Sequence, residues 1–185
     1  MSNFIYVVPE SERIYDLMAA KLKTNYQAQS IDVFFDIDSI MLLGHSNSID
    51  DLTYMIPLGF RTYAPEGADM FLLPRSSSGN PLKLAPTIDD PPYIENLKAQ
   101  KIEVFDNSCL TLANTIGYID WDYRNEWKGM VRSSKDITVS GEKAYLQAIP
   151  VEPSQFKFKL VKTLDEVPKY LRETIRGEKG FGSSG

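Results

Sequence analysis

The chain has very few cysteine and histidine residues, which limits the disulfides and metal sites that it can form. Its 185 residues include one cysteine, Cys109, and one histidine, His45. A disulfide within the chain needs two cysteines, and a zinc site of Cys and His needs about three or four such ligands. The sequence therefore excludes both, and it also lacks the Cys/His signature of the zinc-dependent deaminases.

Two further features are missing. No run approaches the roughly 20 apolar residues of a membrane span, and no block of basic residues interrupts a chain with a net charge of −5. A membrane partner and a duplex nucleic acid partner are therefore not expected. The stretch Met1–Pro9 lacks the basic and long apolar regions of a signal peptide, so we expect a reducing compartment, cytoplasm or nucleus.

The pattern of apolar residues predicts one helix and many short strands. Ser11 is a suitable N-cap for a helix that carries Ile14, Leu17, Met18 and Leu22 on one face. Further along, β-type runs are separated by Gly, Pro, Asn and Asp, which is typical of an all-β sandwich, jelly roll or barrel. The expected strands are 4–8, 31–37, 40–43, 53–56, 60–63, 70–73, 102–105, 115–119, 126–131, 137–139, 144–151 and 156–161.

The length favours one domain, and the pattern along the chain divides it into three parts. Residues 1–30 supply a strand and the helix, and residues 31–162 supply the β domain. Within it, residues 85–108 contain Pro86 and Asp89-Asp90-Pro91-Pro92, and we expect a long excursion between two strands. Residues 163–185 form a polar C-terminal arm, with a short amphipathic piece around 164–171 and a Gly-rich end.

An acidic turn is the most informative local pattern. It reads Tyr118-Ile119-Asp120-Trp121-Asp122-Tyr123 and follows a hairpin-like Asn114-Thr115-Ile116-Gly117. The Asn114 side chain can read the polar edge of a base, and Tyr123 can pack against a sugar. Asp120 can accept a proton from an attacking water. Asp122 and Glu126 are competing carboxylates, and counting charges does not choose among the three.

Two other segments are suited to phosphate. Pro74-Arg75-Ser76-Ser77-Ser78-Gly79 follows an expected strand, and an arginine fork with hydroxyls at a strand end can bind phosphate oxygens. Residues 176–185 combine Arg176, Phe181, several glycines and two serines, but lack the Gly-Lys-Ser/Thr of a Walker A loop. Read alone, the first segment is more typical of a Ser-rich turn with a surface arginine, and the composition of the second favours a flexible linker.

In their order along the chain, these segments resemble the motifs of the trimeric dUTPase family. The resemblance rests on Arg-Ser-Ser, Asn-x-x-Gly-x-Ile-Asp-x-Asp-Tyr-Arg, a following strand with Gln147, and Arg-Gly-x-x-Gly-Phe-Gly-Ser-Ser-Gly. It extends from about Ile31 to Gly185. It implies a jelly-roll or distorted β-barrel homotrimer with active sites at subunit interfaces. It also implies hydrolysis of dUTP to dUMP and pyrophosphate with Mg²⁺.

The resemblance also implies residue roles. Asp120 corresponds to the general base, and the metal is held by phosphates and waters, with Asp36 able to contribute only through a water. The residues that correspond to substrate contacts are Arg75, Ser76, Ser77, Asn114, Gly117, Tyr118, Ile119, Tyr123, Gln147, Arg176, Phe181, Gly182, Ser183 and Ser184. In the family the last five close over the substrate from a neighbouring subunit.

The chain departs from the family pattern at three places. The first motif appears here as Val33-Phe34-Phe35-Asp36-Ile37, with Phe34 in the place of a glycine. One extra residue separates Gly141 from Gln147, and Lys179 replaces a glycine of the last motif. Residues 1–30 have no family counterpart.

Two other functions remain open. The dCTP deaminases are similar in fold and in the Arg-Ser-Ser segment, but carry a catalytic glutamate in the strand after the acidic turn. The corresponding strand here, Trp127–Arg132, contains no acidic residue. The second alternative is a nucleotide-sensing interaction protein whose 85–108 segment docks a partner.

Overall fold

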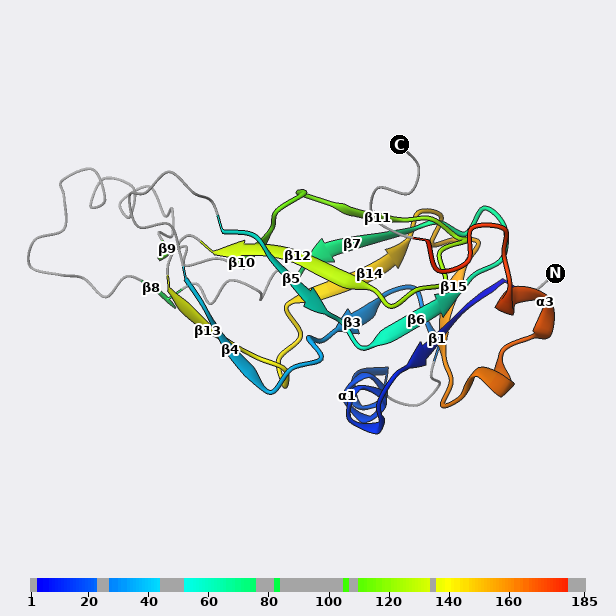
Figure 1. Ribbon diagram of the computed structural model, residues 1–185, viewed down its shortest axis with the longest axis horizontal. Coiled ribbons are helices and arrows are strands. Elements are labelled where there is room, and N and C mark those ends of the chain that lie inside the picture. The colour runs from blue at the N-terminus through cyan, green and yellow to red at the C-terminus, as the bar shows by residue number, and fades with distance from the viewer. Residues whose placement is uncertain are drawn as a thin grey trace, which may run out of the picture.

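The computed structural model describes residues 3–22, 27–43, 52–75, 82–83, 105–106, 110–133 and 136–179. These ranges are mostly strands, which confirms the all-β prediction (Figure 1). Most of the predicted excursion 85–108 lies outside them. No helix in the described part of the chain combines the length and apolar character that crossing a bilayer would require.

The N-terminal strand and helix are built into the body of the molecule. Strand β1 (Phe4–Pro9) pairs in parallel with β15 (Lys157–Leu160) and antiparallel with β6 (Phe60–Tyr63). The short β2 (Gln27–Ala28) completes this sheet beside β15. Helix α1 (Glu12–Leu22) begins where predicted, because the Ser11 hydroxyl accepts the Ile14 amide at 3.3 Å.

A second four-stranded sheet carries the predicted motifs. Its order is β11 (Gly117–Ile119), β7 (Met70–Pro74), β14 (Leu146–Pro150) and β3 (Ile31–Val33), with every neighbour antiparallel. A three-stranded sheet consists of β10 (Leu110–Leu112), β12 (Lys128–Ser133) and β5 (Tyr54–Pro57). Two ribbons lie toward the far end of the molecule from α3 in Figure 1: β4 (Ser39–Leu42) with β13 (Ile137–Ser140), and β8 (Leu82–Lys83) with β9 (Phe105–Asp106).

Aromatic side chains fill the core between these sheets. Trp127 is fully buried, packs against Phe60 with ring centroids 5.0 Å apart, and donates its indole N–H to the Thr62 hydroxyl at 3.1 Å. Phe35 stacks on Tyr145 at 5.5 Å. Phe34, at the position where the family pattern has glycine, is 1% exposed and belongs to the same core. The side chain of Phe34, which a glycine would lack, is therefore accommodated in the hydrophobic core.

The differences from the predicted elements have local causes. The predicted strand 31–37 ends at Val33, because Phe34 and Phe35 are both buried and the two-residue alternation of a strand stops there. The predicted strand 115–119 begins only at Gly117, since Thr115 has a φ of +64°. Strands β2, β8 and β10 were not predicted.

The amphipathic piece predicted around 164–171 consists of two short helices. A 3₁₀ turn, η1 (Leu164–Glu166), is followed by α3 (Lys169–Arg172). Pro168 separates them, because a residue before proline is pushed toward extended backbone, and Val167 has φ −81° and ψ 133°. Val167 and Leu171 anchor the two pieces through a small cluster with Tyr6 and Tyr63.

Candidate active site

The acidic turn follows directly from the pairing of β11 with β7. Ile119 is the last paired residue of β11, opposite Met70, and the chain then turns so that the Tyr123 amide donates to the Asp120 carbonyl at 3.1 Å. The Asp120 side chain is 42% exposed. It is therefore accessible to a water molecule while its backbone is held by the turn.

The hairpin before β11 contains a strained residue. The left-handed φ of Thr115 is unfavourable for a β-branched side chain. The turn is closed by the Thr115 amide on the Leu112 carbonyl at 3.2 Å and by the Ile116 amide on the Asn114 carbonyl at 2.6 Å. Asn114 is exposed at its tip. Strained backbone of this kind is common at ligand-binding sites, which is consistent with the hypothesis that this hairpin contacts a base.

Arg176, from the C-terminal arm, brings three predicted site residues together. Its guanidinium is ion-paired with Asp120, lies 3.4 Å from a carboxylate oxygen of Asp122, and sits 5.5 Å from the centre of the Tyr123 ring. The hydrogen bond to Asp120 is the main cause that raises the pKa of Arg176. Asp120, Tyr123 and Arg176 therefore form one polar site within a single chain.

The arm is held on the body mainly by Arg124, which is 4% exposed. Its guanidinium donates to the carbonyls of Leu171 at 2.9 Å and Trp121 at 2.6 Å, and its backbone N–H donates to the Gly177 carbonyl at 3.0 Å. Burial lowers the pKa of Arg124. The Thr174 hydroxyl adds a bond of 2.7 Å to the Asp122 carbonyl. These contacts fix the arm so that Arg176 faces Asp120.

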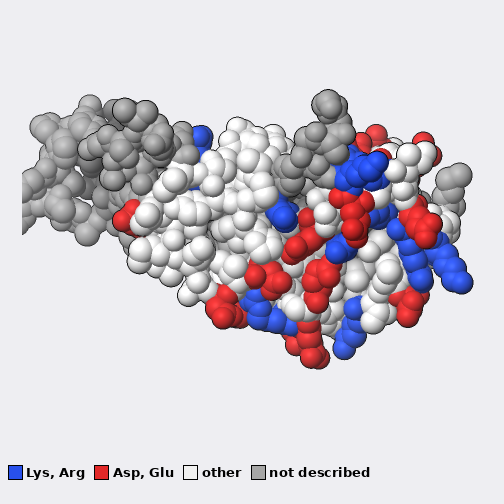
Figure 2. Space-filling view, viewed as in Figure 1, with Lys and Arg blue, Asp and Glu red and all other residues white. Residues whose placement is uncertain are grey.

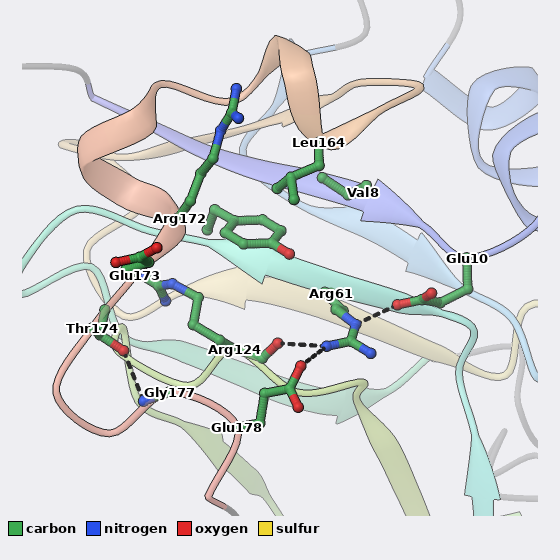
Figure 3. Close-up of a pocket in the computed structure, with 11 residues that line it drawn as sticks. Val8, Glu10, Arg61, Arg124, Leu164, Arg172, Glu173, Thr174, Gly177 and Glu178 are labelled. Carbon is green, nitrogen blue, oxygen red and sulfur yellow. Dashed lines mark hydrogen bonds and ion pairs between the residues drawn. The ribbon is translucent and has the colours of Figure 1, made fainter.

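Two cavities flank the arm. The first has a volume of about 590 Å³ and runs between Tyr63, Leu164 and the loop 173–178. In Figure 3 its Arg61 lies between Glu10 and Glu178 and is ion-paired with both. The second, of about 530 Å³, is lined by residues that include Trp121, Asp122 and Ile175. Neither cavity is lined by Asp120 or Tyr123, and Arg176 lies over the Tyr123 ring.

Arg75 and Gln147 lie elsewhere on the same sheet. Arg75 follows β7 and pairs with Asp32 at 3.0 Å, and Gln147 lies opposite Asp32 in the register of β14 and β3. Asp69, near the acidic turn, precedes β7. Six strand steps of about 3.3 Å therefore separate positions 69 and 75 by roughly 20 Å. The fold of one chain does not bring Arg75 to Asp120.

Asp36 is engaged by the N-terminal helix. Its carboxylate accepts a hydrogen bond from Arg13 at 2.8 Å and packs against Gly59, where an added Cβ would lie 2.8 Å from the Asp36 Cβ. Its side chain is 29% exposed. No cluster of three His, Cys, Asp or Glu residues suited to a metal occurs among the described residues. Ser76, Ser77, Phe181, Gly182, Ser183 and Ser184 lie outside the described residues.

No protein-family model matches the chain. A relative does, the deoxyuridine 5'-triphosphate nucleotidohydrolase of Gamma-proteobacterium EBAC31A08. The two sequences are 31% identical over 137 residues, which cover 71% of this chain and 73% of the relative. The chain belongs to the dUTPase family. This confirms the resemblance that the ordered motifs had indicated.

A solved structure agrees at the level of the fold. The dUTPase of Staphylococcus bacteriophage 80alpha, solved with dUpNHpp, superposes with a TM-score of 0.50 and 12% identity. The match covers 91% of this chain and 100% of the phage chain. The all-β architecture is therefore that of a dUTPase.

Sequence reasoning missed two residues that shape this candidate site. Arg124 was noted only as part of a motif, yet it anchors the arm through carbonyl groups, which leave no sequence signature. Asp69 was not singled out, and both of its carboxylate oxygens hold the acidic turn. The available signal was its position: Asp69 comes one residue before β7, and β7 pairs with β11, the strand that leads into Asp120.

Proposed function

We propose that this protein hydrolyses dUTP to dUMP and pyrophosphate, and that Asp120 activates the water that attacks the α-phosphorus. The observation that carries this proposal is the meeting of Asp120, Tyr123 and Arg176 in one site of a dUTPase-family chain. A partly exposed carboxylate can activate a water, an aromatic ring can pack against the sugar, and an arginine side chain can bind the phosphates.

Each residue has a distinct task. Asp120 accepts the proton of the water, which makes the oxygen a better nucleophile. Tyr123 is 7% exposed, and its hydroxyl is tied to the Glu126 carbonyl at 3.2 Å, so its ring is a fixed surface against which a deoxyribose packs. Arg176 exchanges its carboxylate partners for phosphate oxygens, where bonds between charged groups are strong.

Base selection is assigned to the hairpin before the acidic turn. Asn114 offers an amide, and the backbone of Gly117, Tyr118 and Ile119 offers the edge of β11. At Gly117 an added Cβ would lie 3.0 Å from the Leu72 Cβ, so the close approach of β11 to β7 depends on glycine. Gln147, Ser76, Ser77, Phe181, Gly182, Ser183 and Ser184 complete the proposed contacts.

Mg²⁺ fits this site as an ion that is bound mainly by the triphosphate of the substrate. Mg²⁺ usually keeps several waters and binds through phosphates with one or two carboxylates. The described residues offer no three-ligand cluster, and Asp36 already has Arg13 as a partner. When bound, the metal would neutralise phosphate charge and help orient the α-phosphorus, with any contact to Asp36 made through a water.

We infer a homotrimer with shared sites, because Arg75 is too far from Asp120 of its own chain. Large apolar side chains are exposed on and beside β4 and β5, and they are a suitable surface for other copies. The Tyr54 hydroxyl accepts the Leu43 amide at 2.9 Å and so joins the two strands. Figure 2 shows few charges over this region. Its exposed members are Ile40, Met41, Leu43, Leu52 and Met55.

In this proposal residues 31–162 form the catalytic body, residues 1–30 extend its sheets, and residues 163–185 form the arm. Deamination of dCTP is less well supported, because β12 carries no carboxylate. The interaction hypothesis for residues 85–108 concerns a segment that lies almost wholly outside the described residues.

The deciding experiment measures product formation from dUTP, dCTP, dTTP and UTP. Pyrophosphate and ammonia are quantified in parallel, with and without Mg²⁺. The proposal expects Mg²⁺-dependent pyrophosphate release from dUTP far above that from the other nucleotides. Ammonia from dCTP, or no pyrophosphate from dUTP, would overturn it.

A further inference from the structure

Asp69 uses both oxygens of its carboxylate on the turn that carries Asp120. One oxygen accepts the backbone N–H of Trp121 at 2.8 Å, and the other accepts the Tyr118 hydroxyl at 2.6 Å. Residues 118 and 121 stand on either side of Asp120. Asp69 is itself fixed, because its carbonyl accepts the Val151 amide at 2.8 Å just beyond β14.

These bonds begin where the strand pairing ends. The register of β11 and β7 stops at Ile119 opposite Met70, so no ladder bond holds the chain beyond that point. The Trp121 amide is inside the turn that the Tyr123 amide closes on Asp120. Without an acceptor at position 69, that amide would have to turn toward water, and the Asp120 side chain would turn with it.

The bond to Tyr118 is local in its effect. Tyr118 is 53% exposed, and its ring meets Phe71 edge-on with centroids 5.8 Å apart. The hydrogen bond to Asp69 is the main cause that raises the pKa of Tyr118 to about 12. A half-exposed tyrosine adds little to the hydrophobic core, so this bond acts mainly on the turn that carries Asp120.

We propose that Asp69 is a positioning residue for dUTP hydrolysis, which clamps residues 118 and 121 so that the Asp120 carboxylate points at the attacking water. The inference rests on the proposed function. Its physical basis is that displacing a catalytic group by about 1 Å can reduce turnover about 10²-fold.

The test compares two variants of the full-length protein. Asp69→Ala removes both acceptors and should lower kcat about 10²-fold while KM for dUTP stays near the wild-type value. Asp69→Asn is the matched control, because its amide oxygen can accept the Trp121 N–H and its amide nitrogen can donate to the Tyr118 oxygen. It should retain most of kcat, and an equal loss in both variants would contradict a clamp.

A double-mutant cycle separates positioning from a general structural role. In an Asp120→Asn background, Asp69→Ala should lower the residual rate no further, because no general base is left to aim. An additional loss of about 10²-fold in that background would overturn the inference. If Asp69→Ala does not fold, Tyr118→Phe replaces it. That variant should lose about tenfold in kcat, as expected for one hydrogen bond, and an unchanged kcat would contradict the clamp.

The two proposals fail in different ways. If the wild-type protein releases no pyrophosphate from dUTP, the proposed function is wrong. If the wild type is active and Asp69→Ala keeps the wild-type kcat, the function stands and the positioning role is wrong.

Discussion

Arg176 is ion-paired with Asp120, a residue 56 positions earlier in the chain. The pair places a cation of the C-terminal arm on the proposed general base. Arg176 also covers the Tyr123 ring. Substrate binding must therefore draw Arg176 away from Asp120, and the phosphates are the groups that can do so.

The first prediction concerns this arginine. Arg176→Ala should reduce kcat/KM for dUTP by roughly ten- to a hundredfold, the range expected for losing a charge-assisted hydrogen bond to phosphate. Steady-state pyrophosphate release measures it. Arg172→Ala is the control on the same arm, since Arg172 contacts the Val167 and Asp165 carbonyls and not the acidic turn. Higher activity in Arg176→Ala would contradict a net contribution of this arginine to phosphate binding.

Much of this site could be predicted from the sequence, because residues that act on a nucleotide form short ordered motifs. Asp120, Tyr123 and Arg176 came from such motifs, and the structure brings the three together. The docking of the arm could not be predicted. It depends on Arg124 reaching the carbonyls of Leu171 and Trp121, and every residue has a carbonyl, so the sequence carries no mark of which ones are used.

The fold was predictable to a similar degree. Short β-type runs bounded by Gly, Pro and Asp identified β6 and β7 to within one residue. Two-residue strands such as β2 have too few positions for a period to be recognised. The separation of Arg75 from Asp120 comes from strand pairing, because Arg75 follows the C-terminal end of β7 whereas Asp120 follows the end of β11 that lies beside Met70.

The second prediction concerns stability at high pH. The pKa of Tyr118 is raised to about 12 by Asp69, so the folded state keeps this proton where the unfolded state, with a pKa near 10, has lost it. The stabilisation is therefore complete below about pH 10 and is lost as the pH rises through about 12. Urea unfolding of wild type and Tyr118→Phe should differ more at pH 9 than at pH 11. A difference independent of pH would contradict the raised pKa.

The third prediction concerns the buried hydrogen bond of Trp127. Thr62→Val keeps the shape of the side chain but leaves the indole N–H without its acceptor, at a cost of about 1–3 kcal/mol in the free energy of unfolding. Thr62→Ser, which keeps the hydroxyl, should cost less. In a Trp127→Phe background the effect of Thr62→Val should shrink, and denaturant unfolding of the four proteins measures this. An undiminished effect would assign the loss to packing alone.

The fourth prediction concerns the shared sites. If Arg75 of one subunit serves Asp120 of another, Arg75→Ala and Asp120→Asn impair different parts of one composite site. Unfolding the two variants together and refolding the mixture should restore part of the wild-type activity, since some sites then combine two intact residues. Two refolded Asp120→Asn samples are the control. Absence of any recovery, with mixed oligomers demonstrated, would contradict a site that combines Arg75 and Asp120 from different subunits.

The central claim is that Asp120 is the general base of a dUTP-hydrolysing site. Asp120→Asn keeps the size of the side chain and its ability to accept a hydrogen bond from Arg176, but it removes the basic carboxylate. Pyrophosphate release from dUTP by this variant, measured beside calorimetric binding of the nucleotide, tests the claim most directly. The account predicts a loss of about 10²–10⁴-fold in kcat with binding largely retained, whereas turnover within a few-fold of wild type would contradict it.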